Sequence, residues 1–240
     1  MFKLIETTQT IYSQSELCRA VIEAWNNLYQ SIPSKAAVGI ILSQHSIETG
    51  AKYFWNNNWG NLKVGNDDPN QTVDYMMLKN VWEIENGVKK IYQPPARQTW
   101  FRSFPTLIDG VTFHLNLLKN GRYKSSWPAI EAGDVALFAH DLKVNGYYTA
   151  PESDYVAGMN RFFHPYMASQ DYDQALSESG LVVAPPLQPW VSTPDDPTPP
   201  GISPLDPPAQ INSNIPPTAN WLSTIFTSIM EIFRRWLPKS

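Results

Sequence analysis

The chain has 240 residues, of which 42% are apolar and 12% aromatic, a composition sufficient for one sizeable hydrophobic core. Its net charge of -4 and the lack of a long basic run disfavour nucleic-acid binding. Cys18 is the only cysteine, which excludes an internal disulfide or a thiolate metal cluster and favours an inert, buried thiol.

Helical patterns open the chain. Ser13 and Glu16 form a capping-box signature ahead of apolar residues at helical spacing, so a helix is predicted to begin there. A second helix is predicted to begin at Ser34, directly after Pro33, and to run to Gly50.

A β-hairpin is predicted within residues 72–104, where partial alternation flanks an Asn86-Gly87 turn. Pro94 and Pro95 in this stretch must lie at an edge, at a bulge or at the end of the hairpin. Helical patterns then return at residues 106–119, with Thr106 and Asp109 as a capping pair, at 127–143, and at 151–163, with Pro151 at the start. The predicted fold class is therefore mainly α (α+β), with a small β-hairpin lobe.

The composition changes abruptly near residue 184. Residues 184–219 hold 12 of the 21 prolines and read as an extended, polyproline-type linker, so residues 1–183 form the predicted folded domain. Residues 220–240 are predicted to form an amphipathic helix, because a 100° step from Trp221 to Leu237 separates apolar from polar side chains. A membrane surface and a partner protein are both open as its target; the alternative is a helix folded back on the domain.

No signal peptide or membrane span is recognisable in the chain. Its first residues lack the apolar run of a signal peptide, and no segment reaches the ~20 apolar residues of a membrane span. We therefore expect synthesis in the cytoplasm, and any action outside it would need another exit route.

The predicted second helix carries one carboxylate among apolar residues. Glu48 shares its core-facing side with residues at spacings of three and four: Val38, Ile41, Leu42 and His45. Burial and the negative end of the helix dipole both disfavour an ionised carboxyl in the last turn, so a raised pKa is expected. Such a group suits general acid catalysis at a glycosidic oxygen; the alternative is a solvated last-turn residue.

Aromatic and amide side chains crowd the segment after Glu48. Aromatic faces stack on sugar rings and amides hydrogen-bond to hydroxyl and acetamido groups, which suits a carbohydrate cleft. At least two of the four aromatic residues are expected to be core instead: Tyr53, Phe54, Trp55 and Trp59.

Several short motifs follow one another along the chain: ILSQHSIETG, NNNWGNLK, WEIENGVKK, FRSF, LKNGRY and NGYYTAPESDYVAGM. In this order they resemble glycoside hydrolase family 73, which includes the glucosaminidase domain of the flagellar peptidoglycan hydrolase and has a lysozyme-like fold. The resemblance covers roughly Ala36 to Phe163 and leaves out the first thirty residues, the linker and the terminal helix.

This resemblance implies an enzyme that cuts the β-1,4 bond after N-acetylglucosamine in peptidoglycan. It places Glu48 at the catalytic acid and Glu83 at the second carboxylate on the hairpin, with Glu85 as the near alternative, because alternation puts both on one face. Tyr147 and Tyr155 fall on the family's two tyrosines and would orient the acetamido group or the acid.

The residues predicted to bind the glycan strand, besides the catalytic set Glu48, Glu83 and Tyr147, are Asn57, Asn58, Trp59, Gly60, Asn61, Glu85 and Tyr155. The run from Asn58 to Asn61 departs from the family's usual phenylalanine-glycine pair and is nearer to other lysozyme-like enzymes. This departure leaves open which glycosidic bond is cut.

Two rival functions remain. A muramidase or lytic transglycosylase of the same fold would use the same acid, and a virion-associated wall-penetration or wall-binding protein would keep the cleft without turnover. The combination of these features is typical of a phage or prophage lysis enzyme, and we expect the protein to be one. No cofactor is expected, because the histidines lack metal-ligand spacing: His45, His114, His140 and His164.

Overall fold

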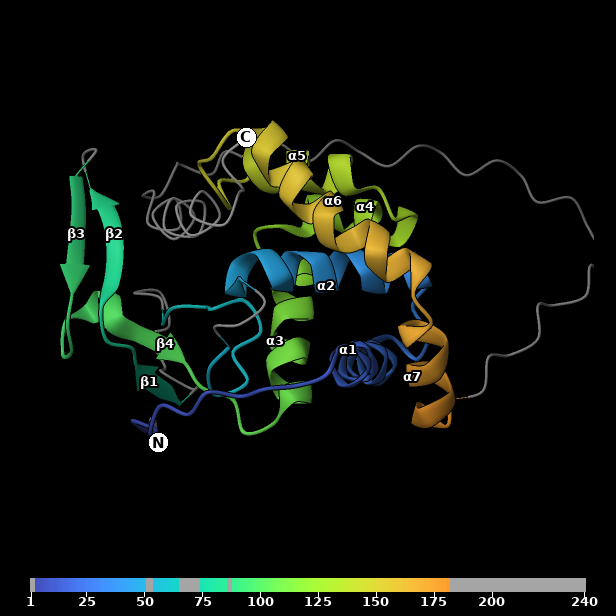
Figure 1. The fold of residues 1–240 in the computed structure, drawn as a ribbon, viewed down its shortest axis with the longest axis horizontal. Helices are drawn as coiled ribbons and strands as arrows, with labels where there is room; N and C mark the ends of the chain where they lie inside the picture. The colour runs from blue at the N-terminus through green and yellow to red at the C-terminus, as the bar shows by residue number, and fades with distance from the viewer. Residues whose placement is uncertain (1–2, 51–53, 65–73, 86–87, 182–240) are drawn as a thin grey trace, which may run out of the picture. The chain divides into compact units, whose positions relative to one another are not determined.

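The computed structural model describes residues 3–50, 54–64, 74–85 and 88–181 (Figure 1). The predicted linker, 184–219, and the predicted terminal helix, 220–240, lie outside the described residues, as does the Asn86-Gly87 turn. The described part is mainly helical with small antiparallel sheets, so the predicted fold class is confirmed. In chain order the elements are α1 (Gln14–Tyr29), α2 (Lys35–Thr49), β1 (Tyr75–Met77), β2 (Val81–Glu85), β3 (Val88–Tyr92), a 3-10 turn (Arg97–Thr99), β4 (Trp100–Arg102), α3 (Leu107–Asn120), a second 3-10 turn (Lys124–Ser126), α4 (Trp127–Ala132), α5 (Val135–Val144), α6 (Glu152–Ala168) and α7 (Asp171–Ser179).

The predicted helix starts are confirmed by their caps. Ser13 and Glu16 form a reciprocal capping box before α1, and Thr106 and Asp109 form another before α3. The Ser34 side chain accepts from the backbone N–H of Ala37 in the first turn of α2.

α2 is the central helix of the described domain. Every residue from Ala37 to Thr49 is buried, and α1, α4 and α6 pack around it (Figure 1). The sequence predicted one core-facing side, whereas the structure buries all sides. The reason is that α2 carries apolar or small residues on nearly every face, which suits a helix enclosed by others.

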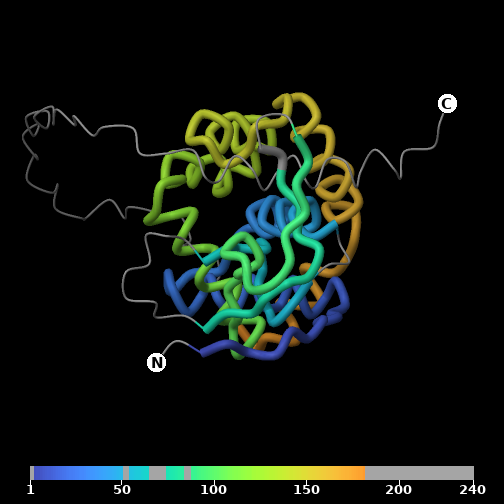
Figure 2. Tube along the Cα trace, turned by 90° about the vertical axis from the view of Figure 1, so that its left-hand side faces the viewer, coloured from blue at the N-terminus to red at the C-terminus, as the bar shows by residue number. Residues whose placement is uncertain are grey.

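The predicted hairpin is formed by β2 and β3. Glu85 lies opposite Val88 and Glu83 opposite Lys90, so the two strands flank residues 86–87 as expected from the turn signal. Pro94 and Pro95 come after β3 ends, one of the three positions allowed to them. Figures 1 and 2 place this hairpin on the side of the domain toward which the C-terminal end of α2 points.

A second small sheet was not predicted. β1 pairs with β4, and the backbone of Leu62 and Val64 bonds to β4 through Arg102 N–H and Trp100 C=O, at 2.9 and 3.1 Å. Strands of three residues are too short to show alternation, so only long-range pairing reveals them.

The later helices differ from the sequence prediction in two places. The pattern at 127–143 divides into α4 and α5 at Gly133, whose φ of 72° ends a helix. α6 continues through Pro165, beyond which Tyr166 is buried and its hydroxyl lies 3.3 Å from Cys18 Sγ. Cys18 has no exposed surface and burial raises the pKa of its thiol to about 11, which confirms the predicted buried thiol.

Candidate active site

Glu48 lies in the last turn of α2, which ends at Gly50 in the left-handed conformation with φ 58°. Its side chain is buried, and burial raises the pKa of its carboxyl well above 4.5, while hydrogen bonds from Tyr147 and Tyr155 oppose the rise. Within the described residues Oε1 has no hydrogen-bond partner. The predicted rise in pKa is therefore confirmed, and the protonated acid is the favoured form.

Two tyrosines hold this carboxyl. Tyr147 comes from the loop after α5 and Tyr155 from α6, and both hydroxyls interact with the Glu48 carboxyl, that of Tyr155 outside full hydrogen-bond geometry. Burial first, and the Glu48 charge second, raise the pKa of both phenols well above 10, so both remain donors. Tyr148 stacks on Tyr155 with 4.0 Å between ring centres, and its own hydroxyl donates to Ala139 C=O at 2.9 Å.

Tyr123 is a third tyrosine of this group and was not among the predicted site residues. Its ring meets Tyr147 edge-on at 4.9 Å, and its side chain is 1% exposed. Burial raises the pKa of its phenol to about 12, with Glu48 adding to the rise and Arg122 opposing it. The one signal in the sequence was its place in the LKNGRY motif.

The buried side chains of Gln44 and His114 extend the polar group beyond Tyr155. Gln44 hydrogen-bonds to Tyr155 weakly: the interaction lowers the pKa of the phenol, yet Gln44 Nε2 meets no described acceptor at full hydrogen-bond geometry. Gln44 Oε1 lies 3.0 Å from His114 Nε2, which must donate to it. Burial lowers the pKa of His114 to about 3, so the neutral ring is favoured.

His45 forms a second neutral imidazole next to this group. Its Nδ1 donates to Trp59 C=O at 2.5 Å, and its ring stacks on the Trp59 ring at 4.1 Å. Burial lowers the pKa of His45 to about 4. Both histidines thus act as fixed hydrogen-bond donors in the core.

The asparagines after α2 brace the loop. Asn57 accepts from the Tyr12 hydroxyl at 2.8 Å and donates to the carbonyls of Phe104 and Pro105. Asn58 is fully buried, and both ends of its amide bond to the backbone of Leu62. The polar atoms of Asn57 and Asn58 are thus engaged by the protein, and their predicted sugar contacts stay predictions.

Backbone conformation explains the abundance of asparagine. Asn56, Asn57 and Asn61 have φ of 43°, 55° and 49°, a left-handed region in which asparagine is tolerated better than most residues. Asn61 donates to Glu48 C=O at 2.9 Å and thereby caps the helix end that carries the acid. Asn61 is half-buried, so its role as a substrate contact stays a prediction.

Trp59 and Gly60 belong to the core. Trp59 has no exposed surface and lies between His45 and Phe54, and its role as a sugar contact stays a prediction. Phe54 is also buried, which confirms that at least two of the four aromatic residues are core; Tyr53 lies outside the described residues. A Cβ at Gly60 would lie 3.1 Å from His114 Nδ1, so glycine leaves room for that ring.

Glu83 lies on β2 in an ion pair with Lys63, and both side chains are largely buried. Burial lowers the pKa of Lys63 to about 8. Within the described residues no hydrogen bond or ion pair links Glu83 to Glu48. The side chain of Glu85 lies outside the described residues, so its predicted role is neither supported nor excluded.

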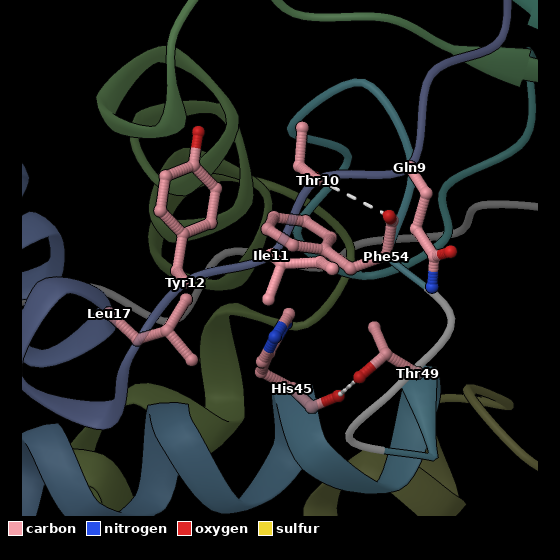
Figure 3. Close-up of a pocket in the computed structure, with 8 residues that line it drawn as sticks. All are labelled: Gln9, Thr10, Ile11, Tyr12, Leu17, His45, Thr49 and Phe54. Atoms are coloured by element: carbon pink, nitrogen blue, oxygen red, sulfur yellow. Dashed lines mark hydrogen bonds between the residues drawn. The ribbon is translucent and has the colours of Figure 1, made fainter.

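A pocket of about 310 Å³ opens between the N-terminal segment and α2 (Figure 3). Glu48 and its tyrosines do not line it, so it is separate from the acid. The residues around it are Gln9, Thr10, Ile11, Tyr12, Leu17, His45, Thr49 and Phe54.

The described residues also limit other kinds of site. They contain no group of three or more His, Cys, Asp or Glu side chains placed to hold a metal ion. None of their helices combines the length and apolar character needed to span a bilayer.

Comparisons with known proteins give no relative from which the role of the site could be inferred. No protein-family model matches the chain, and searches of curated proteins and of solved structures find no match.

Proposed function

We propose that the chain is a peptidoglycan hydrolase that cleaves β-1,4 glycosidic bonds of the glycan strand, with Glu48 as general acid. The observation that carries the proposal is the Glu48 carboxyl, buried at the end of the central helix with a raised pKa and two tyrosine donors. A carboxyl that keeps its proton near neutral pH can transfer it to a leaving glycosidic oxygen. The order of motifs shared with glycoside hydrolase family 73 supports the same chemistry.

The tyrosines support proton transfer in a second way. When Glu48 loses its proton to the leaving oxygen, a carboxylate forms in a buried place. The hydroxyls of Tyr147 and Tyr155 already interact with this carboxyl and stabilise the new charge. Tyr155 is thus placed to orient the acid rather than the sugar.

The second step has two routes, and the Lys63 ion pair favours one of them. A cation beside Glu83 opposes proton uptake by that carboxylate, which weakens it as a general base. Attack on the anomeric carbon by the substrate's own 2-acetamido group does not need this base. The ion pair therefore supports the substrate-assisted route over a water activated by Glu83.

A glycan strand must reach the Glu48 carboxyl for the acid to act on it. Glu48 is only 2% exposed, so the chain must open around the carboxyl when a glycan strand binds.

The test is product analysis on purified sacculi by mass spectrometry, with the wild type, Glu48→Gln and Glu83→Gln. We expect Glu48→Gln to reduce product release by at least about 100-fold, the usual contribution of a general acid. Glu178→Gln is the matched control, because Glu178 is an exposed glutamate on α7. Wild-type turnover by Glu48→Gln would refute the acid assignment.

The same products decide among the rival reactions. A glucosaminidase leaves N-acetylglucosamine at the new reducing end, a muramidase leaves N-acetylmuramic acid, and a lytic transglycosylase leaves an anhydro end. A wall-binding protein without turnover would bind sacculi and release none of these.

A further inference from the structure

The Tyr123 hydroxyl is buried and has no hydrogen-bond partner among the described residues. Leaving a buried hydroxyl unpaired is unfavourable, and a phenylalanine of the same shape would avoid that cost. The ring is held by its edge contact with Tyr147, and the backbone carbonyl accepts from Ser126 N–H and Ser126 Oγ at 2.9 and 2.7 Å. The hydroxyl itself has no described partner and therefore calls for a functional reason.

The Tyr123 ring packs against the tyrosine that bonds to the acid: Tyr147 contacts Tyr123 edge-on and hydrogen-bonds to Glu48. The charge of Glu48 also helps to raise the pKa of the Tyr123 phenol. Glu48 Oε1 is likewise buried without a described partner. Two polar atoms without a described partner, both on neighbours of Tyr147, indicate a place where a polar ligand completes the hydrogen bonding.

We propose that Tyr123 is a substrate-contacting residue whose hydroxyl donates a hydrogen bond to an oxygen of the N-acetylated sugar held at Glu48. This inference rests on the proposed function and adds a donor that neither the motif pattern nor the two predicted tyrosines supplied. The hydroxyl stays protonated at neutral pH, because its pKa is about 12, and so acts as a neutral donor beside the protonated acid.

The chain offers a matched control in Tyr29. Its hydroxyl is also buried without a described partner, and burial raises its pKa to about 12. Its ring, however, packs against Trp25 and Trp127 at 5.2 and 5.3 Å, and Glu48 does not contribute to its pKa. Tyr29→Phe therefore removes a buried hydroxyl without a described partner, outside the site.

The experiment compares the full-length wild type with Tyr123→Phe and Tyr29→Phe. It measures kcat/KM on purified sacculi, the melting temperature, and the rise in melting temperature caused by triacetylchitotriose. We expect Tyr123→Phe to melt at or above the wild-type temperature, to lose about tenfold or more in kcat/KM, and to be stabilised less by triacetylchitotriose. Tyr29→Phe should match the wild type in both sugar readouts.

Three results would overturn the inference. One is wild-type kcat/KM and wild-type sugar stabilisation in Tyr123→Phe. Another is an equal loss in Tyr29→Phe, which would mean that the loss does not come from the site. The third is a wild type that triacetylchitotriose does not stabilise. A wild type that is stabilised by the sugar but releases no product refutes the hydrolase function and leaves the Tyr123 contact to be judged from binding.

Discussion

Glu48 shows how surroundings set the chemistry of one residue. Its position in the last turn of α2 exposes it to the negative end of the helix, and the surrounding helices remove it from water. Both effects favour the protonated carboxyl, while the two tyrosine hydroxyls favour the ionised form and limit the rise in pKa. In the proposed reaction, the same tyrosines would stabilise the Glu48 carboxylate after proton transfer.

Stability should depend on pH through Glu48, with a predictable sign. In the unfolded chain this carboxyl titrates near 4.5, whereas the folded protein keeps the proton to higher pH. As the pH rises above 4.5, the unfolded chain therefore binds fewer protons than the folded protein, and the free energy of unfolding falls. In Glu48→Gln this fall is absent. The free energy of unfolding of the variant, relative to that of the wild type, should therefore rise by up to about 1.4 kcal/mol per pH unit.

Urea unfolding of both proteins between pH 4 and pH 8 measures this difference. Glu178→Gln serves as the exposed control for the loss of one carboxyl. A difference between Glu48→Gln and the wild type that does not change with pH would mean that Glu48 ionises in the folded protein as it does in water.

At the scale of elements, the site depends on how closely α2 and α6 approach. α2 carries Glu48 and α6 carries Tyr155, and each helix contributes a glycine to the contact. A Cβ at Gly39 would lie 2.9 Å from Phe163, and a Cβ at Gly158 would lie 3.2 Å from Ile47. The two glycines thus allow the helix spacing at which Tyr155 reaches the acid.

Gly39→Ala should therefore destabilise the protein and reduce its activity. Alanine gains about 1 kcal/mol of helix propensity over glycine, but overpacking against two aromatic rings costs about 1–3 kcal/mol, so a net loss is expected. Gly158→Ala is the milder comparison, because the Ile47 side-chain end can move, and it should be nearly neutral. Thermal unfolding and product release measure both; a Gly39→Ala variant more stable than Gly158→Ala would contradict this account of the contact.

At the scale of the whole molecule, all residues of the described hydrophobic core belong to the helical domain. The buried apolar cluster runs from Cys18 to Ala175, ahead of the predicted linker at 184–219. Stability and catalysis are then expected from the domain, and membrane or partner binding from residues 220–240.

A variant ending at residue 183 tests this division. It should unfold in one cooperative transition within about 2 °C of the full-length protein and keep its activity on purified sacculi. Co-sedimentation with anionic lipid vesicles should fall on truncation. Equal vesicle binding by both proteins would remove the membrane as a target, and loss of cooperative unfolding would show that the domain boundary is misplaced.

Local sequence patterns were sufficient for several features of this chain. Ser13, Ser34 and Thr106 identify helix starts because a cap is a contact between residues three positions apart. Gly50 likewise marks the end of α2, and the turn signal at 86–87 predicts the β2–β3 pairing. Glu48 could be identified as a buried acid for the same reason: its helix position and its apolar neighbours are adjacent in sequence.

Tertiary structure decided what depends on contacts between distant parts of the chain. Helical periodicity cannot show that α2 is enclosed on every side, nor that Asn58 bonds to Leu62 instead of a sugar. It also cannot bring Tyr123, Tyr147 and Tyr155 to one carboxyl, because they lie on separate segments that meet only when the helices pack. Spacing along the chain encodes which face a residue takes on its own helix, whereas partners across helices are determined by the packing of the whole core.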